Sequence, residues 1–186
     1  AEFKEVDIVS VEQIIEKTSI SQKQWSEIDI KKRSKIILDI GSFIEENKES
    51  YAKIITSEMG KPILEAIGEG EKCTWLCEYY AENGSKFLAD KHIDSNAKSS
   101  FISFEPLGVI LGVMPWNFPF WQVFRFAVPA LLAGNSVLLK HASNVQGSAL
   151  AIEKIFHNSD IPDNTFRTLI VGSSMVSDII SNKHVK

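Results

Sequence analysis

Three short apolar runs follow one another in the second half of the chain, and segments with helical periodicity separate them. The runs start about 30 residues apart, which is the span of a strand–helix–strand unit. They are Leu107–Val113, Val137–Leu139 and Thr168–Val171, with helical segments at about 121–133 and 148–156. The first run is nearly continuous, which favours a strand buried on both faces. We therefore predict an α/β fold that contains the first half of a doubly wound, Rossmann-like parallel sheet.

The part of the chain before this sheet is predicted to be largely helical. A helix over residues 30–60 is indicated by one apolar stripe, which consists of Ile36, Ile37, Ile40, Phe43 and Ile44. Gly60 and Pro62 should end it, since glycine is favoured just past a helix and proline beyond it. A second helix is predicted from about Ile63 to Phe87, and Asn83-Gly84 could end or break it.

Residues 88–104 have a different character from the helices before them. They are polar, rich in serine and asparagine, and finish in the alternating segment Phe101–Phe104. Such alternation predicts a strand with one buried face, and the segment could form an arm outside the main sheet.

Composition and charge restrict the class of protein. Hydrophobic residues make up 44% of the chain and charged residues 24%, as in ordinary soluble globular proteins. A net charge of −4 argues against a nucleic-acid binder. No uncharged apolar run reaches about 18 residues, so we predict no membrane span and no secretory signal. The basic run Lys31–Arg33 is interpreted as a solvated helix face.

Other residues that could carry chemistry give little signal. Cys73 and Cys77 are four residues apart and are expected to be two buried thiols in a reducing, cytoplasmic compartment. The four histidines have no metal-ligand spacing, so no metal site is predicted. The glycine-rich dinucleotide fingerprint and the P-loop pattern are both absent.

Ligands in open α/β sheets bind beyond the carboxyl ends of the strands. Three segments reach such ends here: Met114–Phe120, Lys140–Val145 and Gly172–Ser174. In the first, two prolines bracket Asn117 and should make the loop stiff. A stiff loop can aim the Asn117 amide at a reacting carbonyl and stabilise an oxyanion. The alternative is that Asn117 only bonds the backbone of its own turn.

Two positively charged side chains near these loops could bind a ligand. Lys140 ends a buried strand, where its amine could meet a nucleotide phosphate or ribose hydroxyl, or could simply extend to the surface. Arg125 lies in an apolar helical segment, eight residues after Asn117. It could bind a substrate carboxylate or form an internal salt bridge.

These motifs together resemble the aldehyde dehydrogenase superfamily over most of the chain. The resemblance is carried by a P-W-N-F-P loop, a P-A-L-L-A-G-N turn and an L-L-K strand end within Phe104–Phe156, and by E-M-G-K-P-I-L-E-A at Glu58–Ala66. It implies a helical part of the cofactor domain at 1–87, part of an oligomerisation arm at 88–104, and the first half of the NAD(P)-binding domain at 105–186.

Residue by residue, the resemblance implies an oxyanion-stabilising role for Asn117 and an adenosine-ribose contact for Lys140. The cofactor would also lie along Val113, Met114, Pro115 and Trp116. Ser143 stands where a glutamate tends to favour NAD by repelling a 2′-phosphate, so NAD or NADP is expected. Arg125 matches the arginine that binds the distal carboxylate in bacterial succinate-semialdehyde dehydrogenases.

The family mechanism also uses a nucleophilic cysteine and a water-activating glutamate. Neither is matched in these 186 residues, which correspond to less than half of a typical member. We therefore expect an oxidoreductase acting on a small aldehyde in the full-length form, as a dimer or tetramer, with this incomplete fold inactive alone. The alternative is a non-catalytic fragment that acts only as a nucleotide-binding or interaction module.

Overall fold

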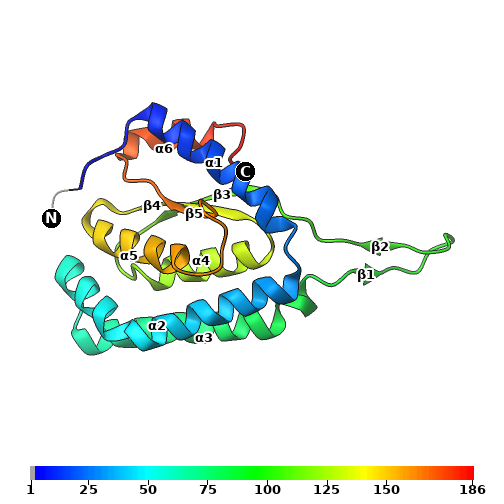
Figure 1. Cartoon of the computed structure of the whole chain (residues 1–186), viewed down its shortest axis with the longest axis horizontal. Helices are drawn as coiled ribbons and strands as arrows, with labels where there is room; N and C mark the ends of the chain where they lie inside the picture. Colours follow the sequence, from blue (N-terminus) through cyan, green and yellow to red (C-terminus); the bar gives the residue numbers. More distant parts are fainter. Residues whose placement is uncertain (1–2) are drawn as a thin grey trace.

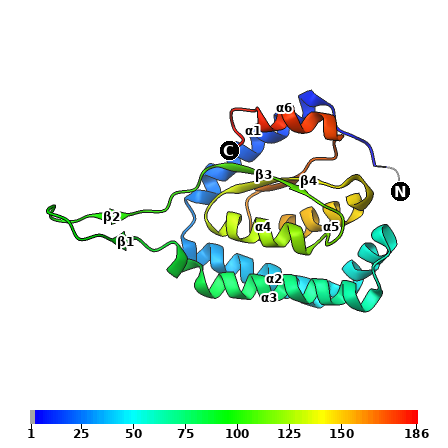
Figure 2. The ribbon, with the colours of Figure 1, turned by 180° about the vertical axis from the view of Figure 1, so that it is seen from behind.

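The computed structural model describes residues 3–186, which form four layers (Figure 1). A parallel sheet lies in the middle, and helices α1 and α6 cover one of its faces. Helices α4 and α5 cover the other face, and the long hairpin of α2 and α3 packs on their outer side, as Figure 2 shows from behind. The helices are α1 (Ile8–Ser26), α2 (Ile30–Met59), α3 (Ile63–Phe87), α4 (Trp121–Leu132), α5 (Gln146–His157) and α6 (Val176–Ile180).

The sheet has the order β3-β4-β5 with all pairs parallel, so the predicted α/β fold and parallel sheet are confirmed. Its strands are β3 (Val109–Met114), β4 (Ser136–His141) and β5 (Phe166–Thr168). The central strand β4 is buried almost throughout, whereas β3 lies at an edge and is only partly buried. The expectation that the first strand is buried on both faces is therefore wrong, since only Val109 and Gly112 of β3 are buried and Val113 is exposed.

The third strand is shorter and earlier than the predicted Thr168–Val171. Pairing with β4 ends where the Leu169 N–H donates to the Leu139 carbonyl at 2.8 Å. The Ile170 carbonyl then accepts a hydrogen bond from Val6 instead of from the sheet. The apolar residues after Thr168 are buried against α1 rather than paired in a strand.

Both long helices of the hairpin have the predicted extents. Asp29 accepts a hydrogen bond from the Lys31 N–H at the start of α2, and Gly60 ends the helix in a left-handed conformation with φ 77°. The second helix continues through Asn83-Gly84. At Gly84 an added Cβ would overlap the Leu132 side chain, so this glycine allows α3 and α4 to pack closely.

Stacked aromatic rings join the helices to the sheet. The Phe124 and Phe156 rings have centroids 5.3 Å apart, and the Phe156 and Phe166 rings 4.4 Å. These side chains come from α4, α5 and β5, so one stack links two helices and a strand. Rings at these separations add attraction beyond their burial.

Arg33 corrects the interpretation of Lys31–Arg33 as a solvated face. Lys31 and Lys32 are exposed, but Arg33 is buried. Its guanidinium donates to the carbonyls of Leu132 at 3.0 Å, Ser26 at 3.1 Å and Ile28 at 2.5 Å. The guanidinium fork can be buried because backbone acceptors meet its donors.

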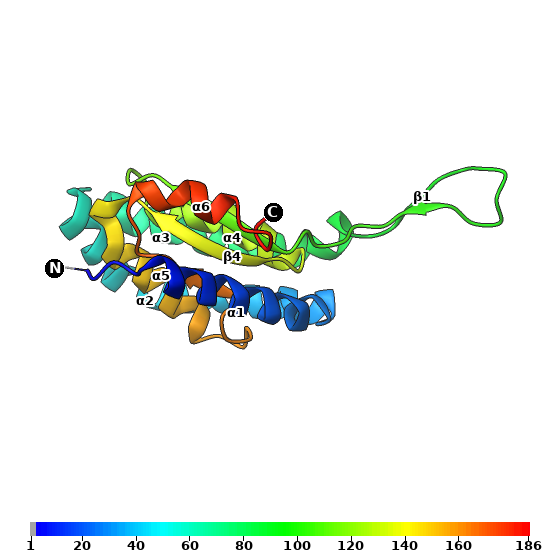
Figure 3. The same cartoon turned by 90° about the horizontal axis from the view of Figure 1, so that it is seen from above.

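Residues 88–104 form an arm that projects from the end of the molecule opposite the α2–α3 connection (Figures 1 and 3). Its strands β1 (Lys91–His92) and β2 (Phe101–Ile102) pair antiparallel. Both residues of β2 are exposed, so the expected buried face is absent from the described chain.

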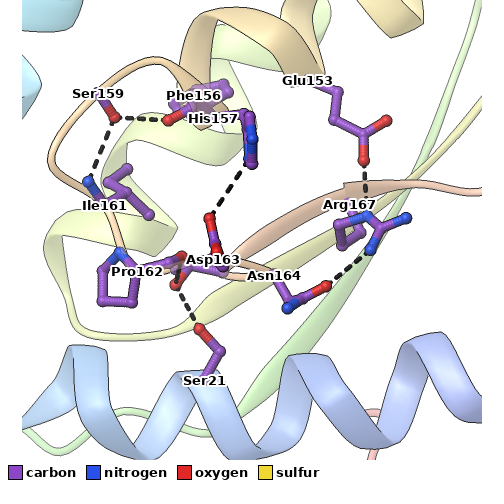
Figure 4. Close-up of polar contacts among 11 residues, drawn as sticks. Ser21, Glu153, Phe156, His157, Ser159, Ile161, Pro162, Asp163, Asn164 and Arg167 are labelled. Atoms are coloured by element: carbon purple, nitrogen blue, oxygen red, sulfur yellow. Dashed lines mark hydrogen bonds and ion pairs between the residues drawn. The ribbon is translucent and has the colours of Figure 1, made fainter.

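A polar network holds α1 against the amino-terminal end of β5 (Figure 4). The hydroxyls of Ser21 and Thr165 are hydrogen bonded at 2.7 Å. Arg167 donates to Glu153 on α5 at 2.6 Å and to Asn164 at 2.7 Å, and Asn164 has a positive φ of 66°. This network lies at the opposite end of β5 from the loops predicted to bind ligands.

Candidate functional site

The loops after β3 and β4 lie side by side at one edge of the sheet. Met114 and His141 are register partners at the ends of these parallel strands. The Ala142 N–H donates to the Met114 carbonyl at 3.0 Å, just beyond the last pair. The Pro115–Phe120 loop and the segment from Ala142 therefore share one site, as the strand pattern predicted.

His141 ties the first loop to the central strand. Its side chain is fully buried, and its Nδ1 accepts a hydrogen bond from the Ala142 N–H at 2.9 Å. The proton of the neutral ring is therefore on Nε2, which donates to the Pro119 carbonyl at 2.9 Å. Burial lowers the pKa of His141, so the ring stays neutral near pH 7.

The other side of the same loop is held by α3. Glu69 is 2% exposed, and its Oε1 accepts hydrogen bonds from the N–H groups of Phe120 at 2.8 Å and Trp121 at 3.0 Å. Its Oε2 forms an ion pair with the buried Lys61. The Lys61 amine also lies 3.8 Å from the centroid of the Phe118 ring, a cation–π distance.

A second glutamate from the same hairpin holds the start of α5. Glu58 accepts hydrogen bonds from the N–H groups of Gly147 at 2.5 Å and Ser148 at 2.8 Å, and from the Ser148 hydroxyl at 2.7 Å. An added Cβ at Gly147 would lie 2.7 Å from the Glu58 carboxylate. Glycine is therefore needed there for the carboxylate to approach the backbone.

Asn117 is exposed at the tip of the first loop. Among residues 3–186 its side chain makes no hydrogen bond, so the turn-closing alternative has no contact to support it. Trp116, 50% exposed, and Phe118, 40% exposed, flank it. The exposed amide thus stands between two exposed aromatic residues in the sequence, on a loop whose backbone is anchored.

The other predicted site residues lie along the same edge. Val113 and Pro115 are exposed and Met114 is half-buried. Lys140 is half-buried beside Val113 in the strand register, and its amine has no ion-pair partner within the described range.

Ser143 and Arg125 complete the predicted set. Ser143 is exposed in the short 3₁₀ helix η1 (Ser143–Val145) that leads into α5. Arg125 is exposed on α4 and donates to the Gln122 side chain at 2.9 Å. No carboxylate pairs with Arg125 in the described part of the chain, so the alternative of an internal salt bridge is not seen.

Cys73 and Cys77 lie inside the helical layer, away from these loops, and both are fully buried. Burial raises the pKa of each thiol, which disfavours the nucleophilic thiolate. Nowhere in residues 3–186 do three histidine, cysteine or acidic side chains gather as metal ligands. None of the described helices is both long and apolar enough to cross a membrane.

The sequence reasoning missed the side chains that hold the loops, namely Glu58, Lys61, Glu69 and His141. A signal existed for Glu69, because Ala66 and Cys73 place it on the buried stripe of α3. A charged residue on such a stripe requires a partner. The identity of that partner could not be read from local sequence, because Phe120 is 51 positions away.

A parallel sheet, helices on both faces and anchored loops at the carboxyl strand ends define the class of α/β proteins that bind ligands beside the sheet. The family model for the aldehyde dehydrogenase family matches residues 1–186. The chain therefore belongs to the aldehyde dehydrogenase family.

Curated relatives and a solved structure agree with this family. A probable NADP-dependent succinate-semialdehyde dehydrogenase of Synechocystis is 49% identical over 77% of this chain and 32% of its own length. The Sad NAD(P)-dependent succinate semialdehyde dehydrogenase of Escherichia coli is 39% identical over 94% of this chain and 38% of its own. A Streptococcus pyogenes succinic semialdehyde dehydrogenase, solved with NADP⁺, superposes with a TM-score of 0.95 at 28% identity.

That structure covers 100% of this chain, and the chain covers 41% of it. The chain thus spans between about a third and two fifths of the relatives it matches.

Proposed function

We propose that the protein oxidises an aldehyde to a carboxylic acid with NAD or NADP as hydride acceptor, and that the aldehyde is succinate semialdehyde. The observation that carries this proposal is the exposed Asn117 amide on a loop anchored from both sides. The names of the Synechocystis and Escherichia coli relatives support the substrate.

In this proposal Asn117 donates an N–H to the aldehyde oxygen as negative charge develops there. A donor held in place needs no rearrangement at the moment of reaction, which is why fixed donors are effective. Trp116 and Phe118 would limit water around this contact. The nucleophilic cysteine and the water-activating glutamate would be supplied by parts of the whole protein that this chain does not include.

The cofactor would lie against Lys140 and Ser143. Lys140 presents an amine without an ion pair in residues 3–186, and the exposed Ser143 places no carboxylate where a 2′-phosphate would meet it. These donors fit a ribose or a phosphorylated ribose. When bound, the cofactor accepts the hydride of the aldehyde carbon.

The three-part organisation belongs to the same proposal. Residues 1–87 and 105–186 would build one cofactor domain, and residues 88–104 would be part of an arm that joins copies into a dimer or tetramer in the cytoplasm. The exposed side chains of Phe101, Ile102 and Phe104 give this arm an apolar surface that a second copy could cover.

The substrate assignment is tested by Arg125→Leu in the protein expressed from its complete gene. We expect kcat/KM for succinate semialdehyde to fall about 10- to 100-fold, because one hydrogen bond to a charged group is worth about 1.5–3 kcal/mol. The value for butanal, which has no carboxylate, should change less than about threefold. Lys154→Leu, which removes an exposed cation from α5, is the matched control. Equal losses on both aldehydes would reject a carboxylate-binding role.

The cofactor assignment is tested by Ser143→Glu. A carboxylate at this position would repel the 2′-phosphate of NADP, so the ratio of kcat/KM for NADP to that for NAD should fall by about tenfold or more, equivalent to about 1.4 kcal/mol. Ser143→Gln has a similar size without the charge and should change the ratio less. An unchanged ratio in Ser143→Glu would place the ribose elsewhere.

A further inference from the structure

The carboxylate of Glu69 acts at the beginning of a helix other than its own. It projects from the second turn of α3 and accepts the first two N–H groups at the start of α4 with one oxygen. Helix α4 has no acidic residue in its first turn, and its N-cap residue, Phe120, makes no side-chain capping bond. Glu69 therefore does the work that a local capping residue does in other helices.

The ion pair between Glu69 and Lys61 is more deeply buried than capping of α4 requires. Glu69 is 2% exposed and Lys61 is 7% exposed, so both charges have been removed from water. Burial of an ion pair adds little net stability compared with an apolar pair of similar size. The buried pair fixes the position of the Asn117 loop, because Lys61 also contacts the Phe118 ring.

These contacts hold the backbone on the carboxyl-terminal side of Asn117. Phe118, the next residue, lies over the Lys61 amine, and the Phe120 N–H is held by Glu69. Between them, the Pro119 carbonyl is held by the buried His141. Three consecutive residues after Asn117 are therefore tied to groups from α3, β4 and the α2–α3 connection, and the two prolines restrict the loop further.

We propose that Glu69, paired with Lys61, is a positioning residue that sets the place of the Asn117 amide through the backbone at Phe120 and Trp121. Glu69 itself contacts neither substrate nor cofactor. The part of this inference that concerns catalysis rests on the proposed function, whereas the anchoring of the loop does not. A displacement of about 1 Å of a reacting group can cost about 10²-fold in rate, so a distant anchor can control activity.

Hydrogen–deuterium exchange of the peptide that covers residues 114–122 tests whether Glu69 anchors the loop, and it needs no activity assay. In Glu69→Ala the amides of Phe120 and Trp121 lose their acceptor, and we expect exchange at least about tenfold faster, the equivalent of about 1.4 kcal/mol. Glu69→Gln keeps an acceptor oxygen and should give an intermediate rate. The matched control is Glu71→Gln, on the same helix, whose half-exposed side chain pairs with Lys48 at the surface. Unchanged exchange in Glu69→Ala would overturn the proposal.

Steady-state kinetics test whether Glu69 acts through Asn117. We expect Glu69→Gln to lower kcat about tenfold or more with little change in KM, since a misplaced donor affects the transition state. Asn117→Ala should lower kcat about 10²- to 10³-fold. In the double variant the loss should equal that of Asn117→Ala alone, because a positioning residue has nothing left to position. Losses that multiply would show an effect independent of Asn117 and refute positioning.

One further variant covers the case in which the buried Lys61 charge prevents Glu69→Gln from folding. The double variant Lys61→Met with Glu69→Gln removes both charges and keeps an acceptor, so it takes the place of Glu69→Gln in both measurements. If the unaltered protein reduces neither NAD nor NADP with any aldehyde, the proposed function is wrong, and exchange at residues 114–122 still decides whether Glu69 anchors the loop.

Discussion

Replacing Glu58 by alanine would remove the carboxylate that holds the start of α5. Three hydrogen bonds would be lost, from the Gly147 N–H, the Ser148 N–H and the Ser148 hydroxyl. Helix α5 has no capping side chain of its own and no acidic residue in its first turn. No neighbouring group within the helix is therefore placed to take over the two freed N–H groups.

The loss of stability expected for Glu58→Ala depends on how far the Glu58 carboxylate is exposed to water. A hydrogen bond to a charged group contributes about 1.5–3 kcal/mol when it is well buried. Glu58 is half-buried, so water can replace part of what is lost, and about 1 kcal/mol for each bond is the appropriate scale. We expect Glu58→Ala to lower the free energy of unfolding by about 3 kcal/mol. For a chain of this length that corresponds to a fall of roughly 6–12 °C in Tm.

Equilibrium urea denaturation followed by circular dichroism measures this change directly. Glu49→Ala, at an exposed position of the same helix, is the control and should change stability by less than about 0.5 kcal/mol. Ser148→Ala removes one of the three bonds and should cost about 1 kcal/mol, with a similar coupling energy to Glu58 in a double-mutant cycle. A loss below about 1 kcal/mol in Glu58→Ala would refute the idea that the carboxylate holds α5.

Two further changes test buried polar groups. Arg33→Met leaves three carbonyls without their donor and should lower stability by about 3 kcal/mol in urea denaturation, whereas the exposed Lys32→Met should cost less than about 0.5 kcal/mol. Burial lowers the pKa of His141 in the folded state, so the unfolded chain binds the proton more readily. Its contribution to stability is complete above about pH 6.5 and is lost as the pH falls below that value towards the folded pKa. Between pH 7.5 and 5.5 the protein should therefore lose more stability than the His141→Gln variant, and equal losses would contradict a buried neutral ring.

The sequence predicted elements well where one pattern dominates. The apolar stripe and the Gly60 stop give the extent of α2, and the buried strand β4 follows from its apolar run. Residues 1–87 were expected to be helical, but no stripe gave the bounds of α1, because its buried face includes Thr18 and Ser21 among its apolar residues. These hydroxyl groups weaken the periodicity, and their burial depends on contacts with the sheet that local sequence does not encode.

The sequence predicted which loops form the candidate site, but it did not predict which side chains anchor those loops. Strand order alone places Asn117 and Lys140 at one edge of the sheet. The groups that hold those loops come from far along the chain: Glu58 lies 89 positions before Gly147, and Glu69 lies 51 positions before Phe120. The sequence can show that a carboxylate such as Glu69 falls on a buried stripe, but only the tertiary fold shows which helix start it binds.

The two glutamates of the hairpin also decide which groups near the loops can attract an anion. A helix start normally offers partial positive charge and free N–H groups to a phosphate. At α4 and α5 that charge is already neutralised by Glu69 and Glu58. The N–H groups of Phe120, Trp121, Gly147 and Ser148 are therefore not free to bind a phosphate. In the proposed function, attraction for an anion at this edge of the sheet would come from a side chain, and Lys140, at the end of β4, is the candidate.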